Sequence, residues 1–262
     1  MAELRQRHRT STGCAVLALG WMALAGADTN SLLKLPSHYV SAKWSKFVEE
    51  RKSHDESLIA MVKAPKRDGK SKEKMGPAVV KVLARTRLPV RALVDTFQSK
   101  DEEVLAEWNK FAGDVTHIKD NVQLQTYRLP WPFMPRDYLV RCTDRVDKAG
   151  HTAHCASLES DHLAPEREGA VRGKSETIWR FRAEPDGATS IHLETLVDPR
   201  GMLPAWLIDK AGKLASVGVV RGLVKATSSR FGKASSAEAT ASDGWSSMWA
   251  SVTGLMRRLV YG

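Results

Sequence analysis

The sequence has few of the features that identify enzymes and metalloproteins. Its 262 residues include only three cysteines, so it is not a disulfide-rich scaffold and has no paired cysteine clusters at zinc-binding spacing. It also has no G-x-S-x-G nucleophile elbow and no glycine-rich phosphate-binding loop. His151 and His154 are close in sequence, but residues three apart on a strand point to opposite faces, which argues against a shared metal ion. We therefore expect no catalytic residues, no metal and no cofactor.

Acidic residues are in the minority. The chain carries 40 Lys and Arg against 30 Asp and Glu, a net charge of +10 at pH 7. Such an excess favours an anionic partner, either a membrane surface or nucleic acid, and nucleic acid has only the net charge in its favour. Six of the cationic residues lie between Lys63 and Lys74, where Pro, Gly and Ser indicate a loop between two strands. That loop is either simply solvated or in contact with an anionic membrane surface.

The N-terminal hydrophobic run, from Cys14 to Ala25, is too short to span a bilayer comfortably. It follows a basic start and precedes the small residues Ala25, Gly26 and Ala27. These are the three parts of a secretory signal peptide covering residues 1–27, so we expect a secreted protein or one in the secretory pathway. An uncleaved anchor, an organellar targeting segment and a plain N-terminal helix are the alternatives, and they would give a cytoplasmic or membrane-associated protein.

Cleavage of this leader would leave two cysteines, Cys142 and Cys155. They lie on consecutive predicted strands around a turn at residues 147–150. A one-residue change of register decides whether they face each other across the hairpin or sit diagonally. The sequence favours two half-buried free thiols, and a disulfide is the hypothesis for an exported protein.

The spacing of apolar residues predicts an α+β chain. The positions of Val40, Trp44, Phe47 and Val48 predict an N-terminal helix over residues 39–51. Further elements are expected as strands at 57–62, 79–87 and 115–129, and as helices at 89–97 and 102–111.

From residue 138 onward, apolar and polar residues alternate as in half-buried strands. Successive hairpins joined by short loops indicate an antiparallel sheet. The residues expected to share a face are Tyr138, Val140 and Cys142 on one strand, Thr177, Trp179 and Phe181 on the next, and Ile191, Leu193, Thr195 and Val197 on the last, with His192, Glu194 and Leu196 on its opposite face.

Two proline-containing stretches interrupt this pattern. Residues 129–138 (LPWPFMPRDY) contain three prolines, which fix φ and remove backbone donors, so the stretch should be a rigid, irregular approach to a strand. Residues 197–209 (VDPRGMLPAWLID) begin with a turn and continue into a helix expected at 205–225. Pro204 lies near the helix start, where a missing N–H is tolerated.

Together these stretches resemble the motifs of the START family, the steroidogenic-acute-regulatory-related lipid transfer domains, over residues 44–230. The resemblance implies a helix-grip fold, in which a curved antiparallel sheet wraps around a long C-terminal helix and encloses a hydrophobic tunnel. It further implies a non-enzymatic protein that binds one sterol, phospholipid or sphingolipid and exchanges it at membranes. The matching residues are Pro130, Trp131, Pro132, Arg136, Asp137 and Tyr138 in the first motif, and Asp198, Pro199, Gly201, Leu203, Pro204, Trp206 and Leu207 in the second.

Nine residues are candidates for lipid binding in such a tunnel. Arg141, His192 and Glu194 are polar positions in otherwise apolar strands, where a buried charge needs a partner such as a lipid head group. Their alternative is solvent exposure on the outer face of the sheet. Trp179 and Phe181 would be tunnel wall or ordinary core. Residues at the start of the last helix resemble the family's lid, with ordinary helix packing as the alternative: Met202, Leu203, Trp206 and Leu207.

The chain also departs from the family pattern. Phosphatidylcholine-binding members carry an arginine three residues before a Trp-Asp pair, whereas this chain has Leu105 followed by Trp108 and Asn109. This difference argues against phosphatidylcholine as the ligand. An arginine that many relatives place six residues after the arginine of the first motif is replaced by Cys142, and Arg141 lies one position earlier.

The C-terminal part divides the chain further. We expect a START-like domain at 39–230, a Ser- and Ala-rich linker at 231–244 and an amphipathic tail at 245–262. As a helix, the tail would carry its tryptophans and other apolar residues on one stripe, suited either to a membrane interface or to packing on the domain. Two other functions remain open on this fold: an enzyme of cyclase or hydrolase type, and a lipid sensor recruited to membranes by the tail.

Overall fold

The computed structural model describes residues 31–35, 39, 42–53, 56–64, 77–110, 112–129, 131–159 and 162–231. In this part of the chain the secondary-structure elements are β1 (Ser45–Arg51), β2 (Ser57–Lys63), β3 (Val79–Thr86), α3 (Val90–Phe97), α4 (Glu102–Trp108), β4 (Ala112–Lys119), β5 (Val122–Tyr127), β6 (Arg136–Asp147), β7 (Gly150–Ser157), β8 (Val171–Arg172), β9 (Lys174–Ala183), β10 (Thr189–Asp198) and α5 (Ala205–Phe231).

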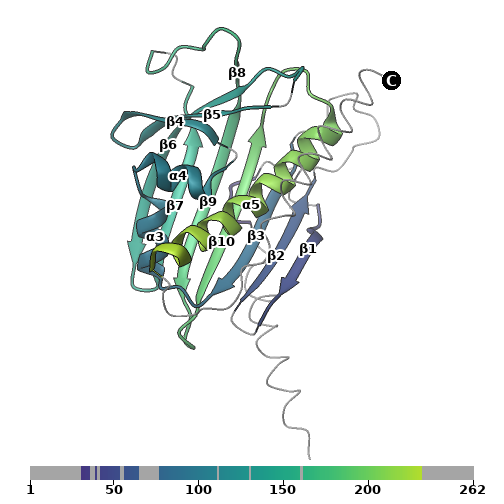
Figure 1. Ribbon diagram of the computed structural model, residues 1–262. Helices are drawn as coiled ribbons and strands as arrows, with labels where there is room; N and C mark the ends of the chain where they lie inside the picture. The colour runs from purple at the N-terminus through teal and green to yellow at the C-terminus, as the bar shows by residue number, and fades with distance from the viewer. Residues whose placement is uncertain are drawn as a thin grey trace, which may run out of the picture.

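The strands form one sheet in the order β1-β2-β3-β10-β9-β7-β6-β5-β4. All neighbours in this order pair antiparallel, and the short β8 adds a parallel pairing to the start of β6. The helix α5 crosses one face of the sheet diagonally, and α3 and α4 lie on the same face beside it (Figure 1). A sheet that grips a long C-terminal helix is the helix-grip arrangement, which confirms the predicted α+β fold class.

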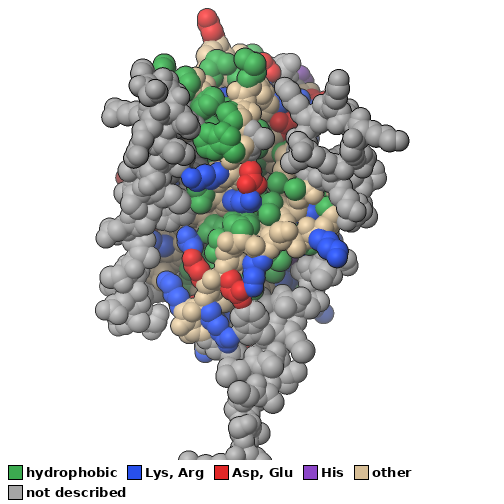
Figure 2. Space-filling view, turned by 90° about the vertical axis from the view of Figure 1, so that its right-hand side faces the viewer, with side chains coloured by type: hydrophobic (Ala, Val, Ile, Leu, Met, Phe, Trp, Pro, Cys, Tyr) green, Lys and Arg blue, Asp and Glu red, His purple; other side chains and the backbone are tan. Residues whose placement is uncertain are grey.

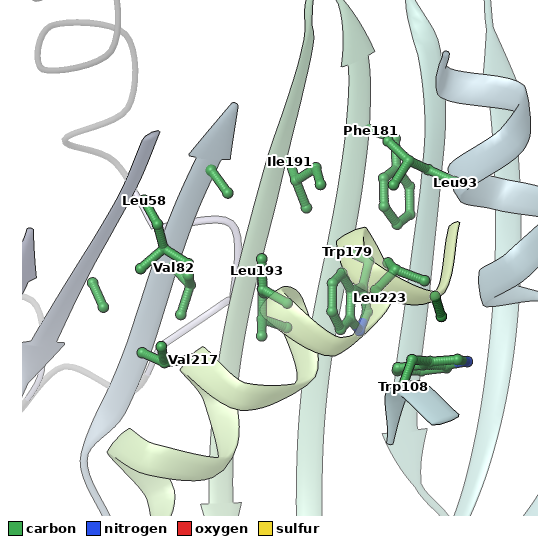
Figure 3. Packing of buried hydrophobic residues seen from close by; sticks show 14 of the residues in the cluster. Leu58, Val82, Leu93, Trp108, Trp179, Phe181, Ile191, Leu193, Val217 and Leu223 are labelled. Carbon is green, nitrogen blue, oxygen red and sulfur yellow. The ribbon is translucent and has the colours of Figure 1, made fainter. Parts of the chain in front are cut away.

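The main hydrophobic core lies between the sheet and these helices. Side chains from β3, β9 and β10 point toward α5 and meet Val217 and Leu223 from the helix (Figure 3). Aromatic rings fill the space near α3 and α4: the Phe97 and Trp179 ring centroids are 5.4 Å apart, and the Trp108 ring stands edge-on to Trp179. Edge-on and tilted packing suits the quadrupoles of these rings. This core fixes α5 across the sheet.

The contact between α4 and α5 requires a glycine. A Cβ atom at Gly222 in α5 would overlap the carbonyl oxygen of Trp108, the last residue of α4. Glycine is normally unfavourable in the middle of a helix, so its presence here reflects the close approach of the two backbones.

The predicted N-terminal helix is wrong for residues 45–51, which form the edge strand β1. The pairing of β1 with β2 has an irregularity between Lys46 and Val48. This β-bulge lets two consecutive residues, Phe47 and Val48, both pack against the core, which produces helix-like apolar spacing in a strand.

Two further boundaries differ from the prediction. The strand expected at 115–129 is a hairpin, β4 and β5, whose turn contains Asp120 at a φ of 39°. Asp and Asn tolerate this left-handed conformation, so the Asp120-Asn121 pair was an unrecognised turn signal. The last helix is six residues longer than expected and ends at Phe231. The other predicted strands and helices are confirmed to within a few residues.

Several predictions fall outside the described residues: the leader at 1–27, residues 65–74 of the basic loop 63–74, the linker from 232 onward and the C-terminal tail. Within the described ranges, no helix has both the length and the apolar character needed to cross a bilayer.

Candidate functional site

A cavity of about 970 Å³ lies between the inner face of the sheet and the helices α4 and α5. Its volume is at the upper end of the usual range for small-molecule sites. Strands β5, β6, β7, β9 and β10 form its floor, α5 forms its roof, and the ends of α4 and the β4–β5 hairpin form one side. At Gly212, on the roof, an added Cβ would meet no atom within 4 Å, so this glycine leaves space in the cavity.

One end of the cavity is apolar. Phe97, Trp108, Trp179 and Leu193 line it, and α5 adds Val219. These residues belong to the hydrophobic core or pack directly against it, so this end of the cavity is continuous with the core. Covering an apolar ligand here would contribute about 25 cal/mol per Å² of apolar surface removed from water.

Uncharged polar side chains line the floor on the other side. The hydroxyls of Thr177 and Thr195 lie 2.7 Å apart and hydrogen-bond to each other. The Tyr127 hydroxyl donates to Gln125 Oε1 at 3.0 Å, and the Tyr127 ring stands edge-on to Tyr138. Burial raises the pKa of both tyrosines above the usual value, so both hydroxyls stay protonated at neutral pH.

Charged side chains border the cavity only where it opens to solvent, with one exception. Arg136 is buried; all the others are exposed: Lys100, Lys110, His117, Asp120, Arg128, Asp144, Asp209 and Lys210. Two of these are held in ion pairs, Arg128 with Asp114 and Asp209 with Lys213, and Asp144 lies 2.8 Å from Nε2 of the buried His151. The cavity therefore has a charged rim and an uncharged interior.

Arg136 explains why the two sequence motifs occur together. Its Nε donates to the Pro199 carbonyl at 2.8 Å, one terminal nitrogen donates to Arg200 O at 3.2 Å, and the other to Met134 O. Burial lowers the pKa of this guanidinium, but arginine starts so high that the group stays charged. The next residue, Asp137, is buried and accepts from Arg172 Nε at 2.8 Å. One buried arginine thus fixes both loops at the mouth of the cavity.

The second loop has the backbone that such a contact needs. Arg200 and Gly201 have φ values of 48° and 68°, and Asp198 Oδ1 accepts from Arg200 N–H at 2.9 Å, which closes the turn. A Cβ at Gly201 would lie 3.3 Å from the Arg136 guanidinium. The turn predicted from the sequence is therefore confirmed, and its glycine also leaves room for Arg136.

Large apolar side chains are exposed on these same two loops. Trp131 and Met134 on the first are 68% and 51% exposed, Met202 on the second is 92% exposed, and Trp206, in the first turn of α5 that follows it, is 43% exposed. We call these four residues the apolar tip. Figure 2 shows hydrophobic side chains gathered at the upper end of one face, at the height of the N-terminal end of α5 in Figure 1, above a region of mixed charge. Four exposed large apolar residues on two adjoining loops and the start of α5 are unusual for a surface that faces only water.

Cys142 and Cys155 form a disulfide in the cavity floor. They are directly opposite each other in the β6–β7 pairing, which settles the register left open by the sequence. The preference for two free thiols was therefore wrong, and the disulfide hypothesis agrees with the structure. Gln123 Nε2 lies 3.6 Å from Cys142 Sγ.

The predicted site residues separate into three groups. Trp179, Leu203 and Leu207 line the cavity. Phe181 lies in the core beyond it, stacked on Trp179 at 5.9 Å. Met202 and Trp206 are exposed in the apolar tip and do not line the cavity. Thus three of the six apolar candidates line the cavity wall, one lies in the hydrophobic core, and two are exposed in the apolar tip.

The three polar candidates do not line the cavity. Arg141 is exposed and alternates with Val140 and Cys142, which do line it. His192 and Glu194 are buried, but on the opposite face of β10. Strand alternation alone could not show which face of β10 lines the cavity and which forms the back of the sheet. The N-terminal segment covers the back of the sheet, so polar residues are buried there as well.

On that back face, Glu194 holds the N-terminal segment. Its carboxylate accepts from Leu32 N–H at 2.9 Å and from the Ser31 hydroxyl, and Lys81 Nζ lies 3.7 Å away. Lys81 also lies 4.4 Å from the centre of the Trp44 ring. Burial alone would raise the pKa of Glu194, but His192, these hydrogen bonds and the Lys81 charge together hold it below its usual value. The cluster is a structural one, away from the cavity.

The two histidines singled out in the sequence each have their own carboxylate partner. His151 Nε2 lies 2.8 Å from Asp144, and His154 Nε2 lies 2.9 Å from Glu176. In the described part of the chain, no group of three or more His, Cys, Asp or Glu is arranged to hold a metal ion.

Other cavity residues were not predicted at all. Sequence reasoning missed Tyr127, Gln125 and Asn109, of which Asn109 is buried at the end of α4 with its Oδ1 lacking a hydrogen-bond partner among the described residues. Alternation in β5, once the hairpin turn is recognised, would have placed Gln125 and Tyr127 on one face.

Comparison with known proteins agrees with this geometry. The sequence pattern of the START domain matches residues 41–231. The chain belongs to the START domain family. An uncharacterised protein of Pseudomonas aeruginosa is 23% identical over 148 residues, which is 54% of this chain and 73% of that protein. The bovine phosphatidylcholine transfer protein is 25% identical over 128 residues, or 46% of this chain and 60% of that protein, so the match spans less than two thirds of its length.

A solved structure shares the START fold at lower identity. The human StAR-related lipid transfer protein 5 superposes with a TM-score of 0.59 at 14% identity, over 84% of this chain and 98% of that chain. At this identity the comparison establishes the fold alone, and the function must be argued from the site.

Proposed function

We propose that this protein binds one lipid molecule in the cavity between the sheet and α5 and exchanges it at membranes, without catalysing a reaction. The observation that carries the proposal is the cavity itself: about 970 Å³, with an apolar end built from core aromatic residues and its charged groups at the rim. The START family membership and the similarity to a phosphatidylcholine transfer protein support it. Apolar burial would supply the binding energy.

The apolar tip gives the proposal a route for the lipid. Leu203 and Leu207 line the cavity, while Met202 and Trp206 on the same segment are exposed. Inserting the exposed pair into a membrane would bring the cavity mouth to the lipid surface. The net charge of +10 favours an anionic membrane as the partner.

The disulfide bears on the compartment. Disulfides persist in oxidising environments and are rare in reducing ones, so the Cys142–Cys155 bridge supports export to the secretory pathway or beyond. The leader-like residues 1–27 support the same localisation.

The proposal is tested by lipid transfer between donor and acceptor vesicles, using the full chain and a cavity-filling variant. Gly212→Phe places a ring in the open space of the roof and should abolish most transfer. Gly212→Ala adds one methyl group at the same position and should transfer at nearly the rate of the unmodified protein. Equal transfer by all three proteins, or none by the unmodified protein, would overturn the proposal.

A further inference from the structure

The floor of the cavity carries a continuous row of uncharged polar and sulfur-containing residues. Thr195, Thr177, Cys155 and Cys142 are directly opposite one another on the successive strands β10, β9, β7 and β6. All four line the cavity, and Gln123 on β5 extends the row through its contact with Cys142. We call these five residues the polar row.

On β10, β9 and β7 the neighbouring row is apolar, and on β6 it ends at the exposed Asp144. Leu193, Trp179 and Ala153 are opposite one another on β10, β9 and β7, two residues along from the polar row, and are buried. Two residues of a strand advance about 7 Å. The floor therefore changes from apolar to hydrogen-bonding within about the length of one small chemical group, which orients an amphipathic ligand along the strands.

A charged head group would have no buried partner at the polar row. Among the described residues that line the cavity, Arg136 alone is both charged and buried, and its guanidinium nitrogens are engaged with the carbonyls of Met134, Pro199 and Arg200. Burying an unpaired phosphate would be costly, whereas an alcohol or amide needs only hydrogen-bonding partners.

The threonine pair can supply those partners. Its mutual hydrogen bond uses one of the two hydroxyl hydrogens, so the other remains free to donate, and both oxygens keep acceptor capacity. Thr195 is buried and Thr177 is half-buried, so the pair lies inside the cavity and not at its exposed rim.

We infer that the lipid bound by this protein carries an uncharged hydroxyl or amide as its inserted polar group, as a sterol, diacylglycerol or ceramide does, and that Thr177 and Thr195 bind this group. The inference rests on the proposed lipid-binding function and names the ligand class. A lipid with a phosphate head group is excluded from the polar row.

The test offers the full chain four kinds of vesicle, each containing one probe in molar excess over the protein: cholesterol, dioleoylglycerol, phosphatidylcholine or phosphatidylglycerol. Bound lipid is extracted and quantified. We expect stoichiometric uptake of an uncharged probe and at most one tenth as much of either phospholipid. Preferential uptake of a phospholipid would overturn the inference and leave the lipid-binding proposal standing. No uptake of any probe would overturn both.

The threonine assignment has its own variant. The double variant Thr177→Val, Thr195→Val replaces each hydroxyl by a methyl group of similar size. It should bind the preferred uncharged lipid about tenfold more weakly. Thr96→Val is the matched control, because Thr96 is buried and hydrogen-bonded to Ala92 O but does not line the cavity. Unchanged affinity in the double variant, with thermal unfolding showing that it is folded, would contradict the assignment.

Discussion

The Nε of Arg136 donates to the carbonyl oxygen of Pro199 at 2.8 Å and so joins two loops 63 residues apart in sequence. The arginine belongs to the first sequence motif and the proline to the second. Each loop also carries part of the apolar tip and part of the cavity mouth. The contact therefore links the stability of the fold to the geometry of the opening.

Arg136→Lys should destabilise the protein by at least about 2 kcal/mol. The planar guanidinium of arginine donates to three carbonyl oxygens at once, and a lysine ammonium lacks this fork of donors. Urea unfolding at neutral pH measures the change. Arg128→Lys is the control: its pair with Asp114 is exposed and long at 3.5 Å, so its loss should change stability by less than about 1 kcal/mol. Equal effects of the two substitutions would contradict the assigned role of Arg136.

Substitution by alanine at two glycines of α5 should change the stability of the protein in opposite directions. Gly222→Ala should cost about 1–3 kcal/mol, because the new methyl group overlaps the Trp108 carbonyl. Gly212→Ala should raise stability by about 0.4–1 kcal/mol, since its position is open and alanine restricts the unfolded chain. Thermal or urea unfolding of both variants checks the pair, and a stabilising Gly222→Ala would show that α4 does not approach α5 as described.

Glu194→Gln should destabilise the protein by about 3–5 kcal/mol at pH 7, because the buried carboxylate that accepts from Leu32 N–H and the Ser31 hydroxyl and lies beside Lys81 would lose its charge. The folded-state pKa of Glu194 is depressed, so its stabilising contribution is present above the unfolded-state pKa and is lost as pH falls through the folded-state pKa. The difference in stability between the two proteins should therefore narrow as the pH falls below about 4.5, the ordinary pKa of a glutamate.

Unfolding titrations at several pH values measure that gap, with His192 and Lys81 as the other ionisable groups facing the carboxylate. Glu176→Gln serves as the control, since Glu176 is half-buried and pairs only with His154 in the described structure. A gap that stays constant or widens on acidification would contradict the depressed pKa.

The disulfide should resist alkylation. Denatured without reductant, the protein should show no modification at Cys142 and Cys155, and reduction should make both reactive. Replacing both by serine should lower stability by about 2–4 kcal/mol, mainly by releasing a constraint on the unfolded chain. Full alkylation of both cysteines before any reductant is added would rule the bridge out.

The apolar tip should act in exchange and not in binding. Met202→Ser with Trp206→Ser should slow transfer between vesicles about tenfold, since less apolar surface enters the membrane, while the amount of lipid bound stays unchanged. Val146→Ser is the control, because Val146 is 76% exposed but lies at the other end of β6. Transfer to anionic acceptors should also slow at high salt, and salt-independent transfer would remove the electrostatic part of the mechanism.

Much of the fold was predictable from local patterns. Alternation over residues 177–197 correctly grouped Trp179 with Thr177 and Leu193 with Thr195 on one face of each strand, and the motif prolines marked the approach to β6 and the start of α5. The bulge in β1 was not predictable in this way, because Phe47 and Val48 are adjacent residues that both face the core only after β2 has paired irregularly with β1.

The site was less predictable because its faces depend on distant contacts. His192 and Glu194 are polar residues in an apolar strand, as expected of a head-group site, but Glu194 has its partners in the N-terminal segment on the back of the sheet, and His192 lies beside Glu194 there. Thr177 and Thr195 look ordinary in sequence. They become a pair only through the β9–β10 register.

The central claim is that the cavity holds one lipid. Native mass spectrometry of the full chain after incubation with mixed liposomes measures this directly, with solvent extraction to identify the bound molecule. The account predicts one lipid per protein chain, lost in Gly212→Phe and retained in Gly212→Ala. A protein that stays empty in the presence of every lipid offered would contradict it.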